Sequence, residues 1–487
     1  MIFRKKTLDS QDCALLYLSL PYLLFFWGWL WLPYALLATV ALLIGLASAI
    51  LGGRSEARED GSRAWGSWRR VLFVAVIALV WVALSGIGGL GFQNPDYPKH
   101  NAVLKDLIEK DWPVLYGEGG GARALVYYIA YYLPAAGVGK LLGWKAANAC
   151  LFVWSTLGVF LFLLSLGKLI RRPIWLLVPA FILLSGLDYV GFLLFLGRSV
   201  DGTTHLEWWM RLDELKEPTR VWQYSSNTTL LFWVPQMCIG GWLLTTSLLS
   251  ETLVAKSSRN LIFLMALSVL WSPFLTIGLI PFVVASLFQN RMKSLVSLQN
   301  LIAAPVLLLL AFFFYRTRSG YENWTWIWEV DHLQKFWTSY LLFLMLEFGA
   351  YAFFLKQRIA GIEPDTRPWF WTAVASLAFF PLYSSGGSND FAMRVAIVPL
   401  LVFWIFALET LLSWEHPTQR LTARILALLL AIGAFTPLTE ISRALWYESS
   451  GIPDYEKVQS VEDLSLSVQY LGRSEDFFFR TLSRDAN

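Results

Sequence analysis

The polar stretch NPDYPKH, which begins at Asn94, carries the residue types best suited to acid–base chemistry in this sequence. It places Asp96, Lys99 and His100 directly after one apolar run and shortly before the next. A carboxylate at the edge of a low-dielectric layer is expected to have a raised pKa, which favours a general acid or base. The neighbouring lysine and histidine could contact phosphate or shift that pKa. A purely structural role is also open, with Asp96 as a helix N-cap ahead of Pro98.

A second polar cluster, HLEWW, begins at His205. Its acidic residue, Glu207, is the second candidate for a catalytic or acceptor-binding acid. The paired rings of Trp208 and Trp209 offer flat amphipathic surfaces, which predict contact with a sugar. We therefore expect His205 and both tryptophans to bind substrate.

Three arginines in later loops are candidates for binding phosphate. Arg394 opens a late apolar stretch, and Arg316 and Arg318 lie in the segment RTRSGYENW. A guanidinium binds phosphate through paired, charge-assisted hydrogen bonds. The alternative is an arginine that merely extends its charge from a helix end into water.

Composition indicates that membrane helices position these residues. The chain has 487 residues, of which 56% are hydrophobic and 15% charged, whereas soluble domains carry about 25% charged residues. The run from Cys13 to Leu51 has no charged residue. It is long enough for two membrane helices and too long for a signal peptide. We therefore expect an integral membrane protein in contact with lipids, and the net charge of +4 requires no nucleic acid partner.

Metal and cofactor motifs are missing from the sequence. The three cysteines lie in apolar runs and the four histidines are scattered singly, a pattern that predicts neither disulfides nor a zinc or haem site. We assign no metal ligand and no cofactor, and leave a divalent cation open.

The apolar windows predict an all-α, polytopic transmembrane bundle of about 13 spans. Their approximate centres are Leu23, Ala41, Val80, Leu157, Leu183, Trp242, Ala266, Phe282, Leu308, Met345, Ser376, Phe403 and Leu429. One alternating topology places six basic connectors in the cytoplasm, with the N-terminus cytoplasmic and the C-terminus extracytoplasmic. These connectors are 52–70, 171–172, 256–259, 291–293, 356–358 and 416–424.

Several segments are expected to lie outside regular spans. Residues 124–144 are interpreted as an interfacial helix with tyrosines in the headgroup layer, following an amphipathic helix in the same outer loop. The run around WSPF predicts two short helices that meet at Pro273. Trp222 and Trp233 fit an aromatic belt at the membrane surface.

The predicted organisation is a transmembrane domain over residues 1–438 and a small extracytoplasmic cap over residues 439–487. The transmembrane domain includes an N-terminal hairpin, 13–51, and an outer loop, 92–145. The compact loops and the absence of a cleavable signal favour a bacterial inner membrane.

Two later motifs resemble the C-superfamily of membrane glycosyltransferases (GT-C). KLLGW at 140–144 precedes AANACLFVWSTLGVFLFLLSLGKLIRRP, and NDFAMRVAIVPLLVFW spans 389–404. The resemblance covers about Val71 to Pro437. It implies a polyprenyl-phosphate sugar donor, with Asp96 as catalytic base and Arg394 as the phosphate-binding residue. The chain departs from the family in its additional N-terminal hairpin and in the single carboxylate of NPDYPKH.

The resulting hypothesis is a GT-C-like glycosyltransferase that transfers a sugar to a glycan or lipid acceptor on the extracytoplasmic face, with inversion. One alternative is an O-antigen-type polymerase or ligase. The other is a solute transporter or lipid flippase, against which the scarcity of charge within the predicted spans argues.

Overall fold

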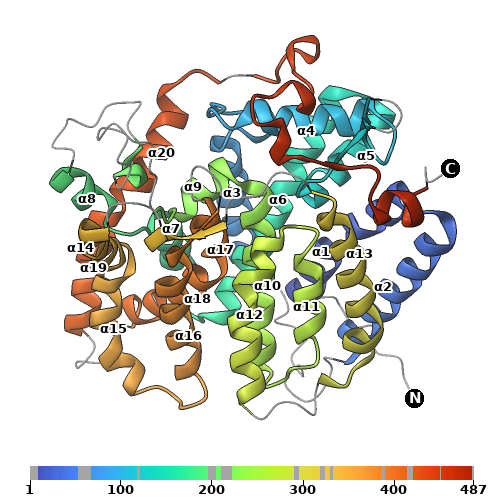
Figure 1. Ribbon diagram of the computed structural model, residues 1–487. Helices are drawn as coiled ribbons and strands as arrows, with labels where there is room; N and C mark the ends of the chain where they lie inside the picture. The colour runs from blue at the N-terminus through green and yellow to red at the C-terminus, as the bar shows by residue number, and fades with distance from the viewer. Residues whose placement is uncertain are drawn as a thin grey trace.

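The computed structural model describes residues 9–52, 67–117, 121–195, 205–209, 222–289, 295–318, 324–329, 333–385, 390–413, 420–449 and 451–484. Within these ranges the chain forms a helical bundle with a few short strands (Figure 1). The helices of the first half are α1 (Ser10–Trp29), α2 (Leu32–Gly52), α3 (Trp68–Leu84), α4 (Tyr97–Glu109), α5 (Leu133–Leu142), α6 (Trp144–Leu169), α7 (Ile174–Leu183), α8 (Asp188–Phe195), α9 (Asn227–Trp233) and α10 (Pro235–Leu249). Those of the second half are α11 (Leu261–Ser268), α12 (Pro273–Phe288), α13 (Ala304–Arg316), α14 (Leu333–Leu344), α15 (Ala350–Ala360), α16 (Arg367–Phe379), α17 (Asp390–Val395), α18 (Ile397–Leu411), α19 (Arg420–Gly433) and α20 (Phe435–Trp446).

Eight helical segments of the described chain are long and apolar enough to cross a membrane. They are Ser10–Trp29, Leu32–Gly52, Trp144–Leu169, Ile174–Leu194, Pro235–Val254, Gln299–Arg316, Trp337–Ala360 and Arg420–Trp446. Each contains one of the expected span centres. The chain is therefore a helical integral membrane protein.

The expected count of about 13 spans is not confirmed. The remaining five centres fall in helices of 17 residues or fewer, namely α3, α11, α12, α16 and α18. At about 1.5 Å per residue such helices are shorter than a hydrocarbon core of about 30 Å. Apolar composition alone marked these segments, and it does not distinguish a buried short helix from a span.

The break at Pro273 is confirmed. Helix α11 ends at Ser268, and α12 begins at Pro273. The side chain of Ser272 accepts a hydrogen bond from the backbone N–H of Phe274 at 3.2 Å. A serine cap followed by proline is a favourable start for a new helix, because proline has no N–H to leave unsatisfied.

The tyrosines of the segment 124–144 are buried inside the protein, whereas Leu141 and Leu142 near its end are exposed. The segment contains β2 (Arg123–Leu125) and the ten-residue helix α5. Tyr131 and Tyr132 are fully buried, and their hydroxyls reach Ser155 Oγ at 2.7 Å and His100 Nδ1 at 2.5 Å. Because protein partners satisfy these hydroxyls, the rings can be buried in the core.

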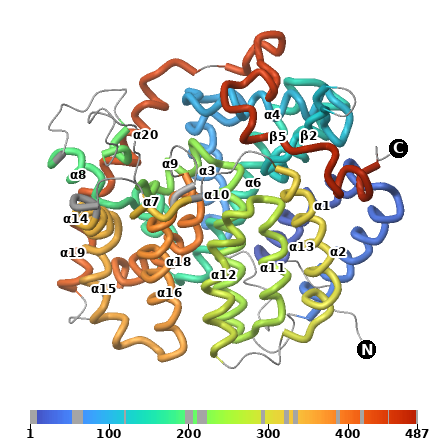
Figure 2. Tube along the Cα trace, viewed as in Figure 1, coloured from blue at the N-terminus to red at the C-terminus, as the bar shows by residue number. Residues whose placement is uncertain are grey.

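The C-terminal segment crosses the same end of the bundle as α4. Strand β5 (Leu471–Arg473) pairs antiparallel with β2, which also pairs with β1 (Leu115–Tyr116) (Figure 2). A second ribbon joins β3 (Trp324–Trp326) to β4 (Tyr383–Ser385). The predicted domain boundary after residue 438 falls inside α20. The segment beyond α20 packs along the bundle, where Trp31 N donates to Leu482 O at 2.9 Å.

The basic connector 256–259 contacts two other loops of the bundle. Lys256 pairs with Glu363 at 3.2 Å, and Arg259 Nη1 donates to the carbonyl of Gly52 at 3.3 Å. In Figure 1 the lower ends of α12, α15 and α16 face away from α4 and the C-terminal segment.

Candidate functional site

A cavity of about 360 Å³ lies where α4, α9, α17, α20 and the C-terminal segment meet. We call it the polar chamber. Six of the residues singled out in the sequence line it, namely Asp96, Lys99, His205, Glu207, Trp208 and Arg394. Residues far apart in the sequence are therefore brought to one site.

Asp96 occupies the residue position before α4, but its carboxylate does not cap the helix. Instead, Lys99 Nζ donates to Asp96 Oδ2 at 2.6 Å. The backbone N–H of Asp96 donates a hydrogen bond to Asn94 Oδ1 at 2.9 Å. This Asx-type turn fixes the backbone without using the carboxylate of Asp96. The carboxylate therefore remains available to the chamber, and the Asp96 side chain is 37% exposed.

The charge environment of Asp96 differs from the sequence-based expectation. Burial alone would raise the pKa of Asp96, but the charge of Lys99 and, to a smaller extent, that of Arg394 lower it below the ordinary value. The pKa of Lys99 is raised, because the attraction of Asp96 outweighs the burial of the ammonium group. Both groups are therefore ionised at physiological pH.

Arg394 supplies the second cation of the chamber. It lies on the short helix α17, where its Nη2 donates to Asp390 Oδ2 at 2.6 Å. The guanidinium carbon lies 5.7 Å from the centre of the Phe274 ring, a cation–π distance. The Arg394 side chain is 12% exposed, whereas that of Asp390 is 43% exposed.

Glu207 is buried in the chamber wall, on a single 3-10 turn (Leu206–Trp208). Its carboxyl accepts hydrogen bonds from Ser226 N at 2.8 Å and Gln223 Nε2 at 3.1 Å. Burial raises the pKa of Glu207, and the neighbouring carboxylate of Asp188 raises it further. The surroundings of Glu207 therefore favour its protonated form, whereas those of Asp96 favour its ionised form.

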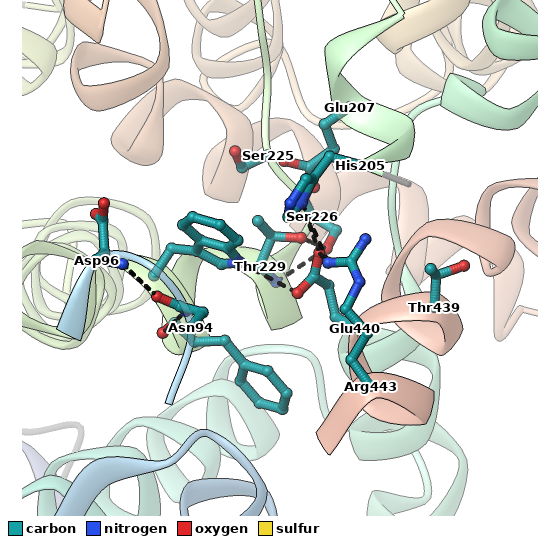
Figure 3. A network of polar contacts seen from close by, with 12 residues as sticks. Asn94, Asp96, His205, Glu207, Ser225, Ser226, Thr229, Thr439, Glu440 and Arg443 are labelled. Carbon is teal, nitrogen blue, oxygen red and sulfur yellow. Dashed lines mark hydrogen bonds and ion pairs between the residues drawn. The ribbon is translucent and has the colours of Figure 1, made fainter. Parts of the chain in front are cut away.

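A third part of the wall was missed by the sequence analysis. Arg443 Nη1 contacts Glu440 Oε1 at 2.6 Å and His205 Nδ1 at 3.1 Å (Figure 3). Trp233 Nε1 donates to Glu440 Oε2 at 3.1 Å, so Trp233 is a wall residue of the chamber. A Glu–Arg pair three residues apart within an apolar helix, as in TEISR, is the signal that could have identified this cluster.

The structure places the other predicted residues outside the chamber lining. His100 is buried, with Nδ1 accepting from the hydroxyl of Tyr132 and Nε2 donating to the carbonyl of Trp233 at 3.1 Å. Burial lowers the pKa of His100 to about 3, so it is neutral. Trp209 is buried against Gly191.

The two loop arginines also lie elsewhere. Arg318 donates to the carbonyl of Gln469 and to the hydroxyl of Tyr128 at 3.3 Å, which ties the C-terminal segment to the bundle. Arg316 is exposed, with its guanidinium 6.0 Å from the Phe312 ring. Neither contributes to the chamber lining.

Three of the four carboxylates that line the chamber are paired with protein cations, namely Asp96, Asp390 and Glu440. Among the described residues, no group of three or more His, Cys, Asp or Glu side chains is arranged to hold a metal ion. No protein family, curated protein or solved structure matches the chain. The chemistry of the chamber is therefore the basis for assigning a function.

Proposed function

We propose that this chain is a GT-C-like membrane glycosyltransferase that transfers a sugar from a polyprenyl phosphate to a glycan or lipid acceptor. The observation that carries this proposal is the meeting of Asp96, Lys99, Arg394 and Trp208 in one chamber. A carboxylate, two cations and an indole ring are the groups that a transferase needs for proton removal, phosphate stabilisation and sugar stacking.

The same proposal places the chamber on the extracytoplasmic side of a bacterial inner membrane, with the N-terminus in the cytoplasm. Its support is that the basic connector 256–259, which contacts two other loops, does not line the chamber. Basic loops are retained in the cytoplasm. The C-terminal segment, which lines the chamber through Tyr470, is then extracytoplasmic.

The proposed reaction is a single displacement at the anomeric carbon. The acceptor hydroxyl forms a new bond to this carbon, and the bond to the phosphate oxygen breaks with its electron pair. Arg394 and Lys99 stabilise the negative charge on the departing polyprenyl phosphate. Asp96 receives the proton of the acceptor hydroxyl, and the product has the opposite anomeric configuration.

Donor binding itself increases the basicity of Asp96 in this mechanism. In the empty chamber the pKa of Asp96 is lowered by Lys99 and Arg394, which makes it a weak base. A bound phosphate attracts the same two cations, so it offsets their effect on Asp96. The carboxylate therefore becomes a better base when the donor is present.

Transfer from purified protein in lipid nanodiscs tests the function. The donors are a polyprenyl monophosphate with one radiolabelled sugar and a polyprenyl diphosphate with a labelled oligosaccharide. We expect turnover of the first. Exclusive use of the diphosphate-linked oligosaccharide identifies a polymerase or ligase. If neither donor gives a covalent product with a broad set of sugars, the proposal is refuted.

A proton-coupled carrier is the second candidate, because the structure reveals buried acids that the sequence analysis did not single out. Asp188 and Glu347 lie in two membrane-spanning segments and are 0% and 2% exposed. Asp188 Oδ2 accepts from Ser185 Oγ at 2.9 Å, whereas Asp188 Oδ1 and Glu347 Oε1 have no hydrogen-bond partner among the described residues. Intramembrane acids of this kind occur in proton pathways.

Flux measurements separate the two candidates. A carrier moves substrate into sealed vesicles without a covalent product, and its flux is lost in Glu347→Gln. The transferase forms product in open nanodiscs and retains it in Glu347→Gln, since an amide replaces the acid without changing the chamber lining.

A further inference from the structure

A second cavity of about 180 Å³ adjoins the polar chamber. We call it the aromatic lobe, because rings of Phe92, Phe232, Trp233 and Tyr447 line it. It borders the chamber, since Pro95, His205, Trp233 and Glu440 belong to both linings. A ligand that occupies both spaces would pass these four side chains.

The polar groups of the lobe are already used by the protein. Ser85 Oγ donates to Val82 O at 2.7 Å, and Asn94 Nδ2 donates to Phe232 O at 2.8 Å. The carboxylate of Glu440 accepts hydrogen bonds from Arg443 and Trp233. The surfaces that remain for an occupant are mainly ring faces, so the lobe suits an apolar group.

The lobe lies on the side of the chamber that carries the proposed base. Asn94 and Pro95, which directly precede Asp96, line it, whereas Asp96, Lys99 and Arg394 line only the chamber. The lobe therefore adjoins the turn that carries the proposed base, and Arg394, the cation that is not bonded to Asp96, does not line it. An acceptor held in the lobe would enter beside Asp96.

The border of the lobe faces the region that lipid covers. Helix α20 supplies Ala444 to the lobe, and Tyr447, which directly follows the helix, also lines it. The same helix exposes Leu438, Leu445 and Trp446. Trp446 is 87% exposed.

From these observations we infer that the aromatic lobe binds the hydrocarbon part of an amphipathic acceptor, whose hydroxyl-bearing head reaches Asp96. The inference rests on the proposed function and narrows it, because it selects a lipid-borne acceptor over a soluble glycan.

Alkyl glycosides with one, eight or twelve carbons are the probes, and Ala444→Phe is the variant that fills the lobe. In the wild type we expect the KM for the acceptor to fall at least about tenfold from one to twelve carbons, because each buried methylene contributes to binding. Ala444→Phe should remove this dependence and leave transfer to the methyl glycoside intact. The matched control is Ser442→Phe, an exposed position on the same helix. A wild-type KM independent of chain length overturns the inference.

Crosslinking gives a readout that does not need turnover. A glycolipid with a photoreactive diazirine in its chain should label peptides of α9 and α20 in the wild type and in Ser442→Phe, and not in Ala444→Phe. Labelling of these peptides by a diazirine-bearing polyprenyl phosphate instead overturns the acceptor assignment. Crosslinking by the glycolipid without sugar transfer from any donor refutes the glycosyltransferase proposal while retaining the lipid site.

Discussion

Replacing Asp96 by asparagine is the sharpest test of the proposed mechanism. The amide has nearly the same shape and keeps the backbone bond to Asn94, which uses the N–H of residue 96 and not its side chain. It cannot accept a proton, so we expect kcat to fall about 10²–10⁴-fold, the usual contribution of a general base. The lost ion pair leaves Lys99, whose side chain is 14% exposed, without its carboxylate, so we expect a stability cost of about 1–3 kcal/mol.

The assay is single-turnover transfer of a labelled sugar in nanodiscs, accompanied by thermal unfolding of each variant. Asp454→Asn is the matched control, because Asp454 pairs with Lys457 at 3.6 Å over the same sequence spacing but outside the chamber. Wild-type turnover in Asp96→Asn, or an equal loss in Asp454→Asn, refutes the assignment of Asp96 as the base. A large fall in the unfolding temperature of Asp96→Asn alone shows a structural role instead.

Four further outcomes follow from the same geometry. Arg394→Ala should raise the KM for the donor about 10- to 150-fold, equivalent to a charged hydrogen bond of about 1.5–3 kcal/mol, with a smaller effect on the acceptor in steady-state kinetics. In pH–rate profiles, the acid limb of kcat should lie at higher pH than the acid limb of kcat/KM. The reason is that kcat reports the donor-bound enzyme, in which phosphate offsets the cations that lower the pKa of Asp96. The raised pKa of Glu207 gives stability that is fully present below the ordinary value of about 4.3 and is lost as pH rises. Glu207→Gln has no proton to lose, so its unfolding temperature relative to that of the wild type should increase toward alkaline pH. Buried Asp106 accepts hydrogen bonds from Tyr116, Ser460 and Val461, so Asp106→Ala should leave buried donors without partners, lower stability by more than about 2 kcal/mol and expose the C-terminal segment to limited proteolysis.

The membrane character and the helix break at Pro273 were predictable because both depend on local sequence. An uncharged run and a Ser-Pro start act within a few residues. The number of spans was not predictable in this way. Helices α11 and α18 are as apolar as the eight long segments but have only 8 and 15 residues, and apolar composition does not predict where a helix ends.

The candidate site was partly predictable for a related reason. Asp96 and Arg394 stand out as charged residues beside apolar runs, and both line the chamber. His100 stands out equally, yet tertiary contacts with Tyr132 and the carbonyl of Trp233 use both of its ring nitrogens. Sequence type marks residues capable of chemistry, whereas access to a cavity depends on partners distant in the sequence.

The exposure of each ion pair distinguishes the cations that can bind a ligand from those that support the fold. Lys99 and Arg394 are paired with carboxylates that are 37% and 43% exposed. Water can solvate these carboxylates when phosphate replaces them, so the exchange costs at most about 1 kcal/mol per pair. Arg443 and its partner Glu440 are only 7% and 10% exposed, and separating such a pair costs about 3–5 kcal/mol. Phosphate should therefore bind at Lys99 and Arg394, while Arg443 keeps Glu440 and His205 in place between the chamber and the aromatic lobe.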